Sequence, residues 1–228
     1  MTQLHLPLSL EPNATFDNYY CHSSYMRTVL DQLIHTRQSI LLSGLSGSGK
    51  THLLQAICHH HKTPWIYIDC NDYQKTNLSI LDNMENQLIC LDNINAIASV
   101  KKWEECLFKL MISDQRLILS SQPQVHFSRN DLQSRIKALD TYDLISLDEG
   151  GQHQALVQRA QNKGLPLPKT VIHWMQRHLP RNNTFLFNFI DQIETESLRQ
   201  QKKGSIQLAK HIWRTLQSVE NESTQSCP

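Results

Sequence analysis

The residues best suited to chemistry form the run Gly44-Leu45-Ser46-Gly47-Ser48-Gly49-Lys50-Thr51. It matches the phosphate-loop pattern G-x-x-x-x-G-K-[ST], which requires a strand before it and a helix after it. Residues 39–43 are apolar enough for a buried strand, and residues 52–58 place their apolar side chains on one side of a helix. Glycines let backbone N–H groups surround a phosphate, and the helix start and the Lys50 ammonium add positive charge. The run therefore predicts a site for a nucleoside diphosphate or triphosphate, with the Thr51 hydroxyl directed to a magnesium ion.

Two further strand ends carry polar groups suited to the same site. Residues 87–91 read as a buried strand closed by Asp92 and Asn93, and Asp92 is expected to orient the water shell of magnesium. The alternative for Asp92 is a cap of the next turn. Asn93 cannot accept a proton, so we expect hydrolysis by the protein itself to be slow or absent. Ser120 ends another predicted strand and is a candidate partner of a terminal phosphate, although serine also suits turns.

The elements that must position these groups alternate between helix and strand. This alternation predicts a doubly wound parallel α/β sheet of five strands. The expected strands are 39–43, 65–69, 87–91, 117–121 and 142–147. The expected helices are 24–35 with Ser23 as N-cap, 52–60, 73–84, 101–111 and 131–136.

The chain changes character at Glu149-Gly150-Gly151, where we expect the alternation to break. Beyond this point only helices are expected, which indicates a second, all-helical domain. We predict helices at about 152–163, 169–179, 184–202 and 206–217, a core that includes Phe185, Leu186, Phe187, Phe189 and Ile190, and a disordered polar tail at 219–228. The resulting division is an arm at 1–12, a nucleotide-binding domain at 13–149, a helical domain at 150–218 and the tail.

The N-terminal residues 1–12 are predicted to be extended, because Pro7 and Pro12 disfavour a helix. The apolar run within them permits two interpretations that the residues alone do not separate. The arm either docks into a pocket of another protein, or it packs as a strand on its own domain.

The composition excludes several broad classes of function. The net charge of +1 with 19% charged residues gives no strong field for nucleic acid, and no apolar run reaches the length of a membrane span. The six cysteines form no C-x-x-C pair and several lie in apolar runs, which indicates buried free thiols in a reducing cytoplasm. The triplet His59-His60-His61 is expected to end a helix rather than to bind a metal, because adjacent histidines face different directions.

Taken together, these features resemble the AAA+ superfamily and, within it, the DnaA-related family that includes the Hda-type inactivators of DnaA. The resemblance runs from Gln3 to about Leu216. The residues that carry it are Gln3-Leu4-x-Leu6-Pro7-Leu8, Thr15-Phe16, Asp92-Asn93-Ile94, Leu132-Gln133-Ser134-Arg135, Leu186-Phe187 and Asp191-Gln192.

The resemblance implies a negative regulator of replication initiation that binds ADP or ATP with Mg²⁺. It assigns nucleotide contacts to Gly44, Gly47, Ser48, Gly49, Lys50, Thr51, His52, Asp92, Ser120 and Arg181, with Thr51 and Asp92 directed to the metal. It implies binding to the sliding clamp, the beta subunit of DNA polymerase III, through Gln3, Leu4, Leu6 and Leu8. It also implies that Arg135 acts as an arginine finger on ATP held by DnaA.

The chain departs from the family pattern in two ways. Its phosphate loop is complete, whereas Hda proteins often carry altered loops. The lid arginine that senses phosphate in the family aligns with Thr184, and Arg181 is the nearby candidate to replace it. An autonomous AAA+ ATPase of helicase-loader type is therefore the alternative, with a small-molecule phosphotransferase or a nucleotide-carrying scaffold as further options. The residues leave open the choice of ADP or ATP, self-association and direct contact with DNA.

Overall fold

The computed structural model describes residues 10–81, 87–113 and 115–225. The chain divides into two compact units, residues 1–146 and 147–228. This boundary precedes the predicted one at residue 149 by a few positions.

The first unit is built on a five-stranded parallel sheet in the order β2-β3-β4-β1-β5, which confirms the predicted sheet. The strands are β1 (Ile40–Gly44), β2 (Trp65–Asp69), β3 (Leu88–Asp92), β4 (Arg116–Ser121) and β5 (Asp140–Leu144). The central strands β1 and β3 are buried along their whole length, as expected for a parallel sheet covered on both faces. Since all strands are parallel, the phosphate loop after β1 and the polar ends of β3 and β4 lie at the same edge.

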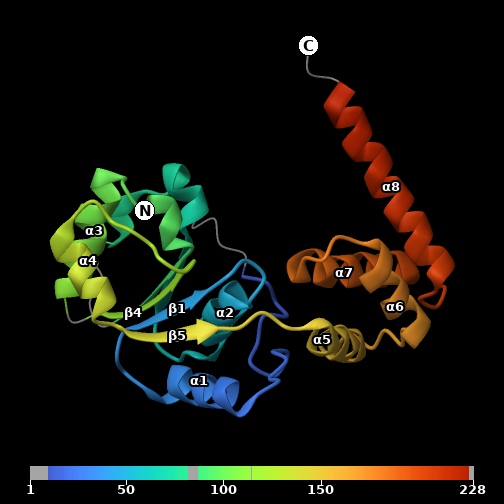
Figure 1. The fold of residues 1–228 in the computed structure, drawn as a ribbon, viewed down its shortest axis with the longest axis horizontal. Helices are drawn as coiled ribbons and strands as arrows, with labels where there is room; N and C mark the ends of the chain where they lie inside the picture. The colour runs from blue at the N-terminus through green and yellow to red at the C-terminus, as the bar shows by residue number, and fades with distance from the viewer. Residues whose placement is uncertain (1–9, 82–86, 114, 226–228) are drawn as a thin grey trace, which may run out of the picture. The chain divides into compact units, whose positions relative to one another are not determined.

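Helices cover both faces of this sheet (Figure 1). On one face, α1 (Ser24–His35) and α2 (Lys50–His60) bury Met26, Leu33 and Leu53 against the strands. On the other face, α3 (Lys101–Ile112) and α4 (Asn130–Lys137) enclose a second apolar cluster. Ser23 caps α1 as predicted, because its hydroxyl accepts a hydrogen bond from the Met26 N–H at 3.1 Å.

The predicted helix at 73–84 is wrong for the part that the structure describes. In its place are two short 3-10 helices, η1 (Cys70–Lys75) and η2 (Leu78–Leu81), and residues 82–86 lie outside the described residues. The chain is extended at Thr76, and the Asn77 side chain accepts hydrogen bonds from Ser79. Asparagine favours such local turns over a continuing helix, which explains the break.

One buried carboxylate fixes the segment that leads into α4. Glu104 is 2% exposed and accepts backbone hydrogen bonds from Ser99 and Ser128 at 2.8 Å and from Arg129 at 3.1 Å. Burial raises the pKa of Glu104, but these hydrogen bonds outweigh it, so the pKa lies below its ordinary value. The start of α4 is thereby tied to α3, although the two helices are separated by β4 in the sequence.

We predict that Glu104→Gln lowers the free energy of unfolding at pH 7 by about 2 kcal/mol, since hydrogen bonds to a charged acceptor are replaced by weaker ones. Because the pKa of Glu104 is lowered in the folded state, its contribution is present above pH of about 4.3 and is lost as the pH falls through the folded pKa. Urea unfolding at pH 7 and pH 3 measures this. The exposed neighbour Glu105 provides the control, and Glu105→Gln should change stability by less than about 0.5 kcal/mol.

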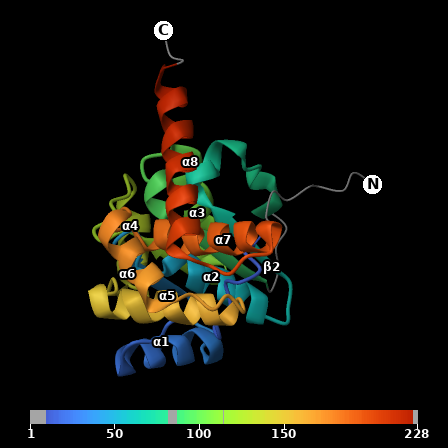
Figure 2. The same ribbon diagram turned by 90° about the vertical axis from the view of Figure 1, so that its right-hand side faces the viewer.

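The second unit is entirely helical within the residues that the structure describes, as predicted (Figure 2). Its helices are α5 (Glu149–Asn162), α6 (Lys169–His178), α7 (Asn183–Gln200) and α8 (Ile206–Gln225). Their core contains Leu186, Phe189 and Ile190 fully buried and Phe185 and Phe187 partly buried, which confirms the predicted cluster. Near the surface of this unit, the Asp191 carboxylate of α7 forms ion pairs with the Arg159 guanidinium at 2.6 Å and with the Lys163 ammonium at 3.1 Å.

Two predicted boundaries in this unit need correction. Helix α5 begins at Glu149 and includes Gly150 and Gly151, because the Asp148 carboxylate caps it by accepting from the Gly151 N–H at 2.7 Å. Helix α8 continues to Gln225, into the segment predicted to be disordered, and no glycine or proline interrupts it there. Residues 226–228 lie outside the described part of the chain.

Candidate functional site

The phosphate loop has the backbone that its glycines allow. Gly47 and Gly49 have φ of 77° and 94°, a region in which side chains are strained. A Cβ on Gly49 would lie 2.9 Å from the Tyr19 ring, and a Cβ on Gly44 would lie 2.6 Å from the Leu144 carbonyl oxygen. Each of these glycines is thus required by backbone conformation or by close packing.

Lys50 lies inside the loop and is 6% exposed. Its Nζ donates hydrogen bonds to the carbonyl oxygens of Gly44 at 2.7 Å and Leu45 at 2.9 Å. Burial lowers the pKa of Lys50, while the nearby Asp92 carboxylate opposes this shift. The ammonium group is therefore held at the centre of the loop, next to the end of β3.

The carboxyl ends of β3 and β4 lie side by side. Asp92 is fully buried, and its Oδ1 accepts a hydrogen bond from the Ser120 hydroxyl, while its Oδ2 accepts one from the Tyr67 hydroxyl at 2.9 Å. Asn93 donates its backbone N–H to Ser120 Oγ at 2.9 Å and its side-chain amide to Asp69 Oδ1 at 3.1 Å. Ser120 thus contacts Asp92 and Asn93, and a role toward phosphate remains a prediction.

Of the two residues after Lys50, Thr51 is exposed at the start of α2, and His52 is half-buried. The His52 ring is hydrogen-bonded to the Thr15 carbonyl oxygen at 2.8 Å and lies 5.5 Å from the Tyr19 ring. His52 therefore holds the N-terminal segment against α2, and its predicted contact with nucleotide is untested.

Arg135 is exposed on α4, and within the described residues its guanidinium forms no ion pair. It lies 5.4 Å from the centre of the Phe108 ring of α3. Arg129 lies over the same ring at 4.3 Å, but it is paired with Asp131 at 2.7 Å, which holds the pKa of Asp131 at about 2. Of these two arginines, Arg135 is the one whose charge is available to an outside group.

Other predicted site residues belong to the second unit or fall outside the described residues. Arg181 and Thr184 are exposed at the beginning of α7 in the second unit, where Asn182 caps the helix. Gln3, Leu4, Leu6 and Leu8 lie outside the described residues.

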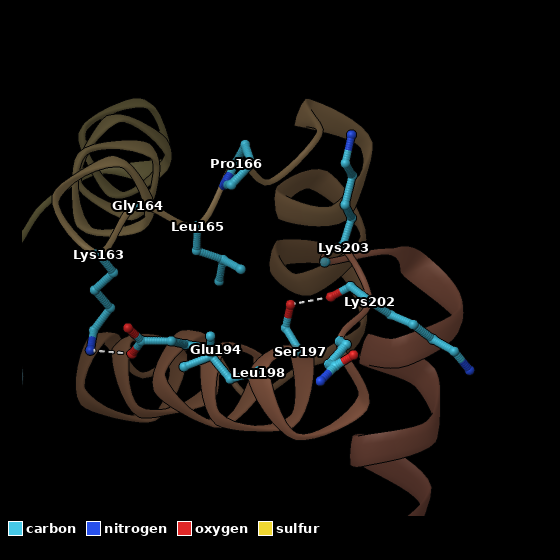
Figure 3. A pocket seen from close by; sticks show the side chains of 11 residues that line it. Lys163, Gly164, Leu165, Pro166, Glu194, Ser197, Leu198, Lys202 and Lys203 are labelled. Atoms are coloured by element: carbon cyan, nitrogen blue, oxygen red, sulfur yellow. Dashed lines mark hydrogen bonds and ion pairs between the residues drawn. The ribbon is translucent and has the colours of Figure 1, made fainter.

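The second unit also carries a hollow that sequence reasoning did not predict (Figure 3). It is lined by Leu165 and Pro166 from the loop after α5, by Leu198 of α7, and by Lys202 and Lys203. The Ser197 hydroxyl closes one side by donating to the Lys202 carbonyl oxygen. None of the predicted nucleotide contacts lines it.

Sequence reasoning missed Tyr67, Gln55 and Phe108. Tyr67 lies within the predicted strand 65–69 and Gln55 within the predicted helix 52–60, and both side chains are buried. The sequence could have indicated these two residues, because a phenol or an amide in a buried strand or helix must find a hydrogen-bond partner. Phe108 gave no signal, since only the fold brings α4 beside it.

Comparison with known proteins adds two family models. Residues 21–138 match the model described as Sigma-54 interaction domain, and residues 148–213 match the model described as Hda, lid domain. Domain III of the replication initiation protein DnaA from Thermotoga maritima has a TM-score of 0.69 at 16% identity, over 89% of this chain and 96% of that one.

The chain is a Hda/DnaA-related AAA+ protein. Its first unit belongs to the family described as Sigma-54 interaction domain. AMPPCP-bound DnaA from Aquifex aeolicus has a TM-score of 0.62 at 19% identity, over 81% of this chain and 65% of that one. The RuvB Holliday junction branch migration motor of Thermotoga maritima has a TM-score of 0.61 at 13% identity, over 91% and 73%.

The residues of this AAA+ site fit a nucleotide phosphate group. Ser48 Oγ is buried and has no hydrogen-bond partner among the described residues, so a polar group in the loop would satisfy it. The loop glycines adopt backbone conformations that are strained for other residues, and the Lys50 ammonium provides positive charge. Thr51 and Asp92 are the oxygen donors that suit magnesium or its water shell.

Other expectations concern the chain as a whole. The cysteines that the structure describes are free thiols, of which Cys58, Cys70 and Cys90 are buried. No group of three or more histidine, cysteine and acidic side chains suited to a metal is found among the described residues. His59 and His60 end α2, as expected. Within the same residues, no helix is both long and apolar enough to cross a membrane.

We predict that Gly49→Ala lowers the free energy of unfolding by about 1–3 kcal/mol and weakens ADP binding, because a side chain there is strained and meets Tyr19. Gly164→Ala is the matched control. Gly164 has φ of 64° but no atom within 4 Å of its Cβ position, so this variant tests strain alone and should bind ADP normally. Calorimetric ADP titration and urea unfolding measure both effects. Unchanged ADP affinity in Gly49→Ala would contradict the assignment of the loop.

Proposed function

We propose that this AAA+ protein is a negative regulator of replication initiation that binds ADP or ATP with Mg²⁺ and stimulates hydrolysis of ATP held by DnaA. The observation that carries the proposal is the exposed Arg135, whose guanidinium has no ion pair among the described residues. The DnaA-like fold and the Hda lid match support the same proposal.

Arg135 has the chemistry of an arginine finger. A guanidinium supplied to a neighbouring active site neutralises the charge that develops on the transferring phosphoryl group, and this accelerates hydrolysis by roughly 10³–10⁵. Phe108 supports this geometry, since its ring lies below the side chains of Arg129 and Arg135 and limits where they can move.

The nucleotide bound by this chain is then a structural ligand. Asn93 follows Asp92 and offers no carboxylate to take a proton from water. Its amide is also engaged with Asp69, which turns it toward β2. The proposed chemistry therefore takes place on the ATP of DnaA, and Arg135 is the group that this chain contributes.

The proposed partners are DnaA and the sliding clamp, in the cytoplasm. The clamp would be bound by the peptide Gln3 to Leu8, which brings the protein to newly replicated DNA. Contact with DNA itself would be weak, given the net charge of +1.

An autonomous ATPase of helicase-loader type is the second candidate. The complete phosphate loop and the RuvB-like fold favour it. A turnover assay on the purified chain distinguishes the two candidates, because steady ATP hydrolysis without DnaA fits only the autonomous enzyme.

We expect Arg135→Ala to reduce stimulated hydrolysis of DnaA-bound ATP by at least about 10³-fold, because the transition-state charge loses its partner. Single-turnover hydrolysis with clamp loaded on DNA measures this. Lys137→Ala, on the same helix, removes an exposed charge and should retain stimulation. Full stimulation by Arg135→Ala would exclude the finger assignment.

We expect the double variant Leu6→Ala with Leu8→Ala to lose capture by the clamp, because these apolar side chains are the proposed anchors. A pull-down with immobilised clamp measures binding. Ser9→Ala changes a residue just outside the peptide and serves as the control. Equal capture of the double variant and the wild type would refute docking through this peptide.

A further inference from the structure

A continuous series of hydrogen bonds joins the exposed Glu11 of the N-terminal segment to the buried Asp92 carboxylate. The Glu11 N–H donates to Gln55 Oε1 at 3.0 Å, Gln55 Nε2 donates to the Tyr67 hydroxyl at 3.4 Å, and that hydroxyl donates to Asp92 Oδ2 at 2.9 Å. Gln55, Tyr67 and Asp92 are 9%, 4% and 0% exposed. Water therefore has little access to these three side chains.

The direction of these hydrogen bonds is fixed by chemistry. An ionised Asp92 only accepts, so the Tyr67 hydroxyl must donate its proton to it. The Tyr67 oxygen then accepts from the Gln55 NH₂ group, which leaves the Gln55 carbonyl oxygen to accept from Glu11. The orientation of each side chain in the series therefore depends on its neighbour. A change at Tyr67 affects both the Asp92 carboxylate and the Gln55 amide that holds Glu11.

The outer end of the series is anchored on the helix that follows the phosphate loop. Gln55 and His59 lie one turn apart on α2, and both hold Glu11, since the His59 ring is hydrogen-bonded to the Glu11 carbonyl oxygen at 3.1 Å. The same helix begins with Lys50. Glu11 lies three residues after Leu8, the last residue of the peptide proposed to bind the clamp.

The inner end of the series acts on the proposed metal site. The Tyr67 hydroxyl donates a hydrogen bond to Oδ2 of Asp92, and the Ser120 hydroxyl donates one to Oδ1. The plane of the carboxylate is therefore fixed by a donor on each oxygen. A carboxylate with two oxygens has lone pairs to spare, and these two donors leave it able to accept further hydrogen bonds. These two hydroxyl donors thus set the orientation of the Asp92 carboxylate.

We propose that Tyr67 is a positioning residue for the magnesium-nucleotide site and that Gln55 couples this site to the N-terminal segment at Glu11. The inference rests on the nucleotide binding in the proposed function. Tyr67 orients the carboxylate that would accept hydrogen bonds from the water shell of magnesium. Gln55 links the Tyr67 hydroxyl to the backbone N–H of Glu11, so the position of one depends on the other. Because such coupling is reciprocal, a partner that immobilises the N-terminal segment strengthens binding of magnesium-nucleotide.

Two variants separate the two steps. Tyr67→Phe keeps the ring and removes the hydroxyl, so both the Asp92 orientation and the link to Gln55 are lost. Gln55→Leu keeps the Tyr67–Asp92 hydrogen bond and removes only the link to Glu11. Tyr73→Phe removes a phenol hydroxyl that contacts Gln74 on the surface, and it is the matched control.

The first measurement is ADP affinity by calorimetry, with Mg²⁺ and with EDTA. We expect Tyr67→Phe to reduce the strengthening by Mg²⁺ about tenfold, the size of one hydrogen bond to a charged group, and Gln55→Leu and Tyr73→Phe to retain it. Equal Mg²⁺ dependence in Tyr67→Phe and wild type would overturn the positioning role. An absence of ADP binding in the wild type would instead refute the proposed function.

The second measurement is hydrogen exchange of the Glu11 amide by NMR, which reports its bond to Gln55 without any ligand. We expect faster exchange in Tyr67→Phe and Gln55→Leu than in wild type, and slower exchange on addition of Mg·ADP in the wild type alone. The Leu119 amide in β4 serves as a reference for global stability. Glu11 exchange that is the same in all variants would overturn the coupling, whatever the ADP titrations show.

Discussion

The burial of the Asp92 carboxylate constrains the residues around it. A charge removed from water must be compensated by hydrogen bonds or by an opposite charge, and an uncompensated one would destabilise the fold by several kcal/mol. The structure supplies hydroxyls from β2 and β4 and the nearby Lys50 ammonium. These groups come from two strands and the phosphate loop, so the satisfied carboxylate at the end of β3 ties the ends of β2, β3 and β4 together.

A second buried carboxylate has the same role on the opposite face of the sheet. Glu104 binds three backbone N–H groups and so fixes the loop that leads to α4. As a result, Arg135 and Phe108 lie together although they belong to different helices. One acidic residue thus organises the nucleotide end of the unit, and the other orients the surface proposed to meet DnaA. In both cases a polar group in the core specifies the position of a functional side chain.

The low sequence identity to proteins of similar fold has a physical reason. The DnaA and RuvB structures have a similar fold, with TM-scores of 0.61–0.69, at identities of only 13–19%. Packing tolerates many apolar side chains of suitable volume, whereas the loop glycines, the lysine and the buried aspartate serve geometric and electrostatic needs that few residues meet.

Local sequence determined the features that depend on neighbouring residues. The phosphate loop, the Ser23 cap, the buried strands and the change to helices near residue 149 follow from residue type and spacing, because backbone conformation and periodicity are local properties. The same reasoning misplaced the segment 73–84, where Asn77 begins a new turn, and the start of α5, where the Asp148 cap accommodates two glycines. Only the tertiary structure decided that Tyr67 and Gln55 lead from Asp92 to Glu11 and that Phe108 lies beside Arg135. These contacts join residues far apart in the chain, and strand order and helix packing set them rather than any local pattern.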